Sequence, residues 1–173
     1  MTNAPKKRTL LLVPMKDPEK SKTRLRDSLN LKDRAYLAKS LFKRTLQILK
    51  IVANNNASLR LDLAVISASP EIIDLSKSNN LFSILETGTQ SLKNATEIAK
   101  VWATNNGYRS ICILPADLAN PDPEEIISFL KEANGNRFVT LSPSADLGTN
   151  ALPIIAPAPL PTRFLISSVD LVG

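Results

Sequence analysis

Charged side chains are concentrated directly after the first apolar run of the chain. Residues 13–25 read VPMKDPEKSKTRL, where Pro14 ends the apolar run and four basic side chains follow: Lys16, Lys20, Lys22 and Arg24. Lysine and arginine neutralise phosphate charge, and arginine can bind a phosphate through two parallel hydrogen bonds. The segment lacks the glycines of the GxGxxG and GxxxxGK[ST] loops, so side chains would have to replace backbone amides as phosphate ligands. On composition alone, a solvated charged loop without a ligand is the favoured interpretation.

An aspartate occupies the corresponding place after a later apolar run. Asp117 follows the run SICIL within the segment LPADLANPDPEE. A carboxylate there would lie at the end of a strand and could hold Mg²⁺, which prefers one or two carboxylates together with substrate phosphates. A turn in which the aspartate bonds its own backbone is the alternative. The nearby Asp122, Glu124 and Glu125 are interpreted as helix-capping residues.

A third candidate stretch is SADLGTNALPII, residues 144–155. Gly148, Thr149 and Asn150 precede an apolar run here, and could bring backbone amides and the asparagine side chain against a ligand. A turn that feeds a strand explains the same pattern equally simply.

Composition excludes several kinds of chemistry and of partner. The 173 residues carry a net charge of +6 and no histidine, which excludes histidine triads, histidine metal sites and histidine acid–base catalysis. Aromatic residues make up only 5%, and none alternate with arginine as in a stacking platform, so no nucleic-acid partner is expected. No stretch approaches the length of a membrane span. The one cysteine, Cys112, is interpreted as a buried core residue, and a cytoplasmic location is expected.

The elements that must position these residues alternate between strand and helix. Asn30 is the expected N-cap of the longest helix, and Asp122 with Pro123 starts another. Alternation of this kind predicts a three-layer Rossmann-like α/β sandwich with a mostly parallel sheet, whose ligands bind outside the carboxyl ends of the strands. Regular structure is expected to fail after Asn150. Strands are predicted at 9–14, 61–67, 81–86, 110–114 and 137–142, and helices at 30–53, 70–78, 91–107 and 122–133.

Three of these stretches together resemble the guanylyltransferases of coenzyme F(420) biosynthesis, the CofC/FbiD family. The family patterns VPxKxxxxxKxRL, LPADLPxxxPEEI and GTNAL stand here, in the same order, as VPMKDPEKSKTRL, LPADLANPDPEEI and GTNAL. The resemblance implies a nucleotidyltransferase fold of the nucleotide-diphospho-sugar transferase type. It also implies a reaction in which GTP and a phosphorylated three-carbon acid (2-phospholactate, phosphoenolpyruvate or 3-phosphoglycerate) give a guanylylated acid and pyrophosphate.

The resemblance also implies roles for individual residues. Lys16, Lys22 and Arg24, next to Pro14, would hold the triphosphate, and Asp117 would bind Mg²⁺; Lys16, Arg24 and Asp117 are the catalytic candidates. The guanine side would include Ser67, and the nucleotide site Asn94, although the family's Leu-Asn pair is here interrupted by Lys93. Thr149 and Asn150 would line the acceptor side.

The chain is expected to form a single nucleotidyltransferase-like domain, residues 1–173, that is short at the C-terminus, because nothing around Asp170 matches the late aspartate-bearing segment of the family. A non-catalytic or degenerate nucleotide-binding relative that acts as a partner subunit is therefore an alternative. Another nucleotidyltransferase would be expected to carry a GGxSxRMG loop, which is absent. The proline-rich end leaves a homodimer open.

Overall fold

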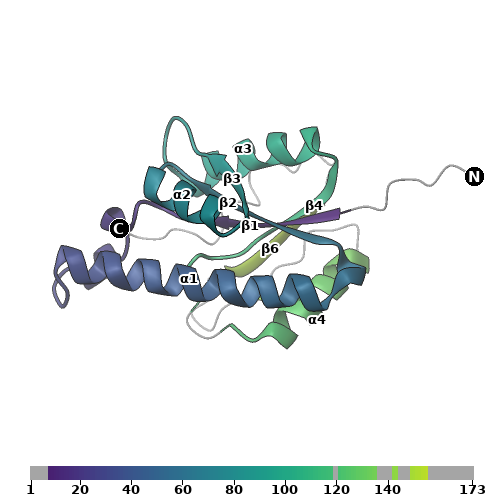
Figure 1. Ribbon diagram of the computed structural model, residues 1–173, viewed down its shortest axis with the longest axis horizontal. Helices are drawn as coiled ribbons and strands as arrows, with labels where there is room; N and C mark the ends of the chain where they lie inside the picture. The colour runs from purple at the N-terminus through teal and green to yellow at the C-terminus, as the bar shows by residue number, and fades with distance from the viewer. Residues whose placement is uncertain (1–7, 119–120, 136–141, 144–148, 156–173) are drawn as a thin grey trace, which may run out of the picture.

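A twisted sheet between two layers of helices forms the centre of the molecule (Figure 1). The structure is a computed structural model that describes residues 8–118, 121–135, 142–143 and 149–155. The strand order is β3-β2-β1-β4-β6-β5, in which β1, β2, β3 and β4 run parallel and β6 runs antiparallel to both β4 and β5. The predicted mostly parallel sheet is confirmed. The strands are β1 (Arg8–Pro14), β2 (Leu61–Ser67), β3 (Phe82–Leu85), β4 (Tyr108–Ile113), β5 (Ser142–Pro143) and β6 (Thr149–Ile155).

The helices divide between the two faces of the sheet. Leu11 and Val13 of β1 pack into a core with α1 and α4, while Leu10 and Leu12 face the opposite way into a core with α3. Figure 1 shows α3 on one side of the sheet, and α1 and α4 on the other. Successive strand residues point to opposite faces, so a strand with continuous apolar sequence serves both cores. The predicted three-layer α/β fold is confirmed. The helices are α1 (Leu31–Asn55), α2 (Pro70–Ser78), α3 (Leu92–Asn105) and α4 (Pro123–Gly135).

Helix starts follow the capping chemistry of the sequence. Asn30 caps α1, with its Oδ1 accepting a hydrogen bond from the Asp33 amide at 2.9 Å. The Asp122 Oδ1 accepts from the Glu124 amide at the start of α4, also at 2.9 Å. Each contact satisfies one of the free amides that a helix leaves at its first turn. None of the helices in the described ranges is both long enough and apolar enough to cross a membrane.

β6 is the main departure from the sequence prediction. Residues 151–155 continue as a strand, with Leu152 opposite Ile113 and Pro153 opposite Cys112, so the expected loss of regular structure after Asn150 is wrong for this stretch. Proline weakens a strand because it lacks a backbone donor, but it is tolerated where one side of the strand is unpaired. β5 reaches β6 only at Thr149 and Ala151, so Pro153 lies where β4 is the one neighbour that the structure describes. The strand predicted at 137–142 lies outside the described residues except for Ser142.

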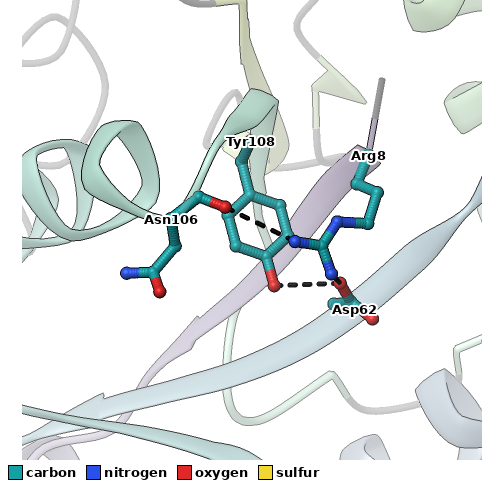
Figure 2. Close-up of polar contacts among 4 residues, drawn as sticks. All are labelled: Arg8, Asp62, Asn106 and Tyr108. Atoms are coloured by element: carbon teal, nitrogen blue, oxygen red, sulfur yellow. Dashed lines mark hydrogen bonds and ion pairs between the residues drawn. The ribbon is translucent and has the colours of Figure 1, made fainter. Parts of the chain in front are cut away.

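A polar cluster that sequence analysis did not identify ties together the amino ends of three strands (Figure 2). The Arg8 guanidinium donates to Asp62 at 3.0 Å and lies 4.8 Å over the Tyr108 ring, and the Tyr108 hydroxyl donates to the same carboxylate oxygen at 2.9 Å. Burial, followed by the Asp62 hydrogen bond and charge, raises the pKa of Tyr108 far above its usual value. The cluster lies at the opposite end of β1 from Pro14, and its contacts join β1, β2 and β4.

Core packing also yields a stability prediction at Thr45. This side chain is fully buried in α1, and its hydroxyl has no hydrogen-bond partner among the residues that the structure describes. An unsatisfied buried hydroxyl costs about 1–3 kcal/mol, so Thr45→Val should stabilise the fold by about 1 kcal/mol. Urea denaturation should show a higher midpoint with an unchanged slope.

Thr96 provides a matched control for that experiment. It is buried to the same degree in α3, but its hydroxyl donates to the Leu92 carbonyl at 2.7 Å. Thr96→Val removes a hydrogen bond that is made, so it should give no gain in stability. Equal effects of the two substitutions would contradict the assignment of Thr45 as unsatisfied.

Candidate functional site

The loops after β1 and β4 leave neighbouring parallel strands at the same edge of the sheet. Leu12 of β1 lies opposite Ile113 of β4, and the Leu114 amide donates to the Leu12 carbonyl at 2.9 Å. The chain leaves β1 toward α1 on one face and enters β4 from α3 on the other. Such a reversal of strand order is the point at which open α/β sheets bind ligands, beyond the carboxyl ends of the strands.

The basic loop after β1 is held in a defined shape. The Asp17 Oδ1 accepts from the Glu19 amide at 3.1 Å, and the Ser21 hydroxyl donates to the Asp17 carbonyl at 3.0 Å. Arg34 of α1 reaches back to the Ser21 carbonyl at 3.4 Å. The loop contains two short 3₁₀ turns, η1 (Pro18–Lys20) and η2 (Thr23–Leu25). The loop is therefore held against α1, while Lys16, Lys20 and Arg24 within it are exposed.

Lys22 lies between the two turns and reaches across to the loop after β4. Its backbone is left-handed, with φ 55° and ψ 36°, and its ammonium forms an ion pair with the Asp117 carboxylate. The left-handed conformation costs a residue with a Cβ roughly 1–2 kcal/mol. The exposed fraction is 24% for the Lys22 side chain and 47% for Asp117, and pairs this exposed contribute only about 0–1 kcal/mol. The ion pair therefore does not offset the cost of the left-handed backbone, so a gain in fold stability does not explain why Lys22 adopts this conformation.

The other residues predicted to hold the triphosphate lie close to Lys22 in the sequence. Pro14 is the last residue of β1, opposite Ile66. Lys16 and Arg24 are exposed, and the structure shows no ion pair of Lys16 with any residue in the ranges that it describes. Their position supplies positive charge to the same edge of the sheet as Asp117.

Two of the predicted nucleotide residues make contacts within the protein. Ser67 is fully buried, and its Oγ accepts from the Ser69 amide at 3.1 Å. The Asn94 side chain donates to the Thr87 carbonyl at 2.7 Å, which closes the loop between β3 and α3. Through these contacts Ser67, the last residue of β2, and Asn94, in the first turn of α3, hold the loops that follow β2 and β3, and their nucleotide roles stay predictions.

The predicted acceptor residues begin a strand at the same edge. Thr149 and Asn150 are the first two residues of β6. Since β6 is antiparallel to β4 and Leu152 lies opposite Ile113, the start of β6 extends beyond the carboxyl end of β4. Register thus places these two residues beside the loop that carries Asp117.

Asp117 is the predicted ligand of a divalent cation here, and its carboxylate is paired with Lys22 in the structure. The part of the chain that the structure describes holds no group of three or more potential metal ligands. One carboxylate suits a Mg²⁺ that takes its other ligands from phosphates and water, and suits a closed all-protein site poorly. Cys112 is buried in β4, and burial raises the pKa of its thiol to about 12, so this thiol is not a nucleophile.

Two hollows in the described structure lie elsewhere. One of about 360 Å³ lies between α1 and α4 and is lined by residues such as Asn55 and Glu124; the other, of about 290 Å³, lies beside β2 and β3. Neither is lined by a residue of the loops after β1 or β4. Charge and strand topology therefore identify the candidate site more clearly than cavity shape does.

Comparison with known proteins decides the family. Residues 9–169 match the family model described as guanylyl transferase CofC like. The chain belongs to this family. The resemblance on which the sequence analysis relied is thereby confirmed, and with it the class of enzyme, a guanylyltransferase-type nucleotidyltransferase.

Individual relatives agree with that assignment. The chain is 37% identical over 161 residues to the 3-phospho-D-glycerate guanylyltransferase of Colwellia psychrerythraea. The aligned residues make up 93% of this chain and 74% of the relative. It is 29% identical over 154 residues to the phosphoenolpyruvate guanylyltransferase of Rubrobacter xylanophilus. These residues make up 88% of this chain and 72% of that relative. The two relatives carry different acceptor acids in their names, so family membership leaves the acceptor open.

A solved structure supports the fold. A nucleotide-diphospho-sugar transferase from Desulfovibrio desulfuricans G20 superposes with a TM-score of 0.65 at 18% identity, over 86% of this chain. The chain spans 64% of the length of that structure. At this identity the likeness concerns the fold, and it confirms the predicted nucleotide-diphospho-sugar transferase type.

Proposed function

We propose that this protein transfers GMP from GTP to a phosphorylated three-carbon acid, with release of pyrophosphate, as a step of coenzyme F(420) biosynthesis. The observation that carries the proposal is the meeting of the basic loop with Asp117 at the carboxyl ends of β1 and β4. The names of the two relatives favour 3-phosphoglycerate and phosphoenolpyruvate as acceptors, and 2-phospholactate is the third candidate.

The residues at this edge suit the reaction. An oxygen of the acceptor's phosphate attacks the α-phosphorus of GTP, and the bond from that phosphorus to the β-phosphate oxygen breaks. The attacking oxygen is already ionised, so no general base is required, and the absence of histidine is no obstacle. What the protein must supply is positioning and positive charge, and we assign this role to Lys16, Lys22 and Arg24 of the basic loop. Asp117 would hold Mg²⁺, whose contribution is to neutralise charge on the phosphates.

The proposal is tested by incubating the protein with GTP, Mg²⁺ and each of the three acids. Pyrophosphate release should depend on both GTP and one acid, and mass spectrometry should detect the guanylylated acid. Replacing GTP by ATP or CTP tests the base. Binding of GTP without turnover on any acid would favour the alternative of a non-catalytic partner subunit, and absence of GTP binding would contradict both.

The triphosphate role of Arg24 gives a separate prediction. Arg24→Ala should raise the KM for GTP about tenfold, since a charge-assisted hydrogen bond is worth about 1.5–3 kcal/mol. Loss of one cation should also make the KM less sensitive to added salt. Steady-state kinetics at two ionic strengths measures both effects.

Arg109→Ala is the matched control for Arg24→Ala. Arg109 is also exposed and carries the same charge, but it lies near the amino end of β4, away from the candidate site. Its replacement should leave the KM for GTP within about twofold. Equal effects of the two substitutions would show that Arg24 acts only through net charge.

A further inference from the structure

We propose that Lys22 and Asp117 are partners only in the nucleotide-free protein, and that they separate when nucleotide binds. Lys22 then moves to the triphosphate, and the Asp117 carboxylate becomes available to a divalent cation. The cation site is therefore closed by the protein's own ammonium until nucleotide arrives. This inference rests on the proposed function for the identity of the nucleotide, but its central test requires neither GTP nor turnover.

The geometry of the pair is the first argument. Lys22 and Asp117 are 95 residues apart in sequence, and the contact joins the loop after β1 to the turn after β4. The Lys22 ammonium contacts Oδ2 of the carboxylate, an oxygen that a metal ion would use. An ammonium in that place acts as a stand-in for the cation.

The backbone of Lys22 is the second argument. A lysine in the left-handed region is uncommon, and the two turns η1 and η2 on either side keep it there. Strained residues of this kind persist where the surrounding structure enforces them, and they concentrate at ligand sites and switches. The ion pair itself is too exposed to repay the strain through fold stability. What the strained backbone does achieve is to place the Lys22 ammonium against the Asp117 carboxylate.

Charge explains why nucleotide and cation would bind together. Without nucleotide, a divalent cation would have to displace an ammonium from a single carboxylate. Mg²⁺ gives up its water reluctantly and seldom binds one protein carboxylate alone. A triphosphate offers Lys22 a partner with more negative charge and offers the cation further oxygen ligands. By linkage, the nucleotide must then strengthen cation binding by the factor by which the cation strengthens nucleotide binding.

The central experiment measures Mn²⁺ binding in the absence of nucleotide, by electron paramagnetic resonance of the free ion. Lys22→Asn removes the ammonium and places a residue that tolerates the left-handed backbone. It should tighten Mn²⁺ binding about tenfold, because a unit charge in contact with a divalent ion is removed. Lys22→Gly is a second variant that suits the same backbone, and Lys22→Arg should bind Mn²⁺ as weakly as the wild type.

Two controls show whether the tighter Mn²⁺ binding of Lys22→Asn depends on the Asp117 carboxylate. Lys20→Asn makes the same change of charge in the same loop at an exposed residue, and should alter Mn²⁺ affinity by less than about twofold. The double variant Lys22→Asn with Asp117→Asn should lose the gain, which a double-mutant cycle quantifies.

Three results would overturn the inference: unchanged or weaker Mn²⁺ binding in both Lys22→Asn and Lys22→Gly, a gain that survives the loss of Asp117, or an equal gain in Lys20→Asn. Each of these is measured on protein without GTP or acid. A failure of the proposed function would appear instead as absence of pyrophosphate release, with the Mn²⁺ result intact.

Discussion

Asp117→Asn should lower the kcat of guanylyl transfer at least about 100-fold and leave the fold intact. A metal ion contributes several kcal/mol to stabilising charge on transferring phosphoryl groups, and each 1.4 kcal/mol is a factor of ten in rate. The carboxylate is the candidate metal ligand at the edge formed by the carboxyl ends of β1 and β4. Asparagine keeps its shape and its capacity for a turn hydrogen bond but binds Mg²⁺ poorly.

The stability of this variant separates the catalytic role from a structural one. Asp117 is 47% exposed, and its pair with Lys22 contributes no more than about 1 kcal/mol, so the urea midpoint should move little. Asp74→Asn is the matched control, since Asp74 is an exposed carboxylate in α2. Near-wild-type turnover in Asp117→Asn, or an equal loss in both variants, would show that Asp117 is a turn residue.

Local chemistry in the sequence was sufficient to predict most of the fold. The boundaries of α2 were predicted as found, because proline and serine mark them, and the start of α1 followed from Asn30 and Asp33. The parallel order followed from alternation of strand and helix, for which handedness leaves few arrangements. The sequence leaves a strand at β6 only as an alternative, because Pro153 and the prolines after it indicate irregular structure, and whether a proline is tolerated depends on which strand lies beside it.

The candidate site could be predicted only in part, because its residues meet through tertiary structure. Sequence indicated that Lys22 and Asp117 would lie at one edge, but the ion pair between them depends on the left-handed backbone at Lys22, which no local pattern predicts for a lysine. Asn94 was selected by likeness to a family pattern, and its bond to the Thr87 carbonyl depends on the conformation of the preceding loop. Arg8, Asp62 and Tyr108 come from three separate strands, and only the register brings them together.

Phe42→Ala should lower the stability of the fold and leave kcat nearly unchanged, the reverse of what is expected for Asp117→Asn. Phe42 is fully buried in α1 within the core that joins this helix to β1, β2 and α4. Truncating a buried phenylalanine leaves a cavity and costs about 3–5 kcal/mol, a large part of the 5–15 kcal/mol that typically stabilises a domain. Urea denaturation should show a midpoint reduced by a corresponding amount, and Phe42→Leu, which refills most of the volume, should recover much of it.

The kcat of Phe42→Ala tests whether the candidate site depends on the packing of α1. Phe42 lies in the same helix as Arg34, which anchors the basic loop, but two turns further along it. The kcat per folded molecule should therefore stay within about twofold at a temperature where the variant is folded, while the fraction folded falls. Tyr36→Ala, at a 72% exposed position of the same helix, should change neither quantity appreciably. A large fall in kcat for folded Phe42→Ala would instead show that α1 transmits its packing to the loop through Arg34, and that the basic loop depends on the core for its catalytic shape.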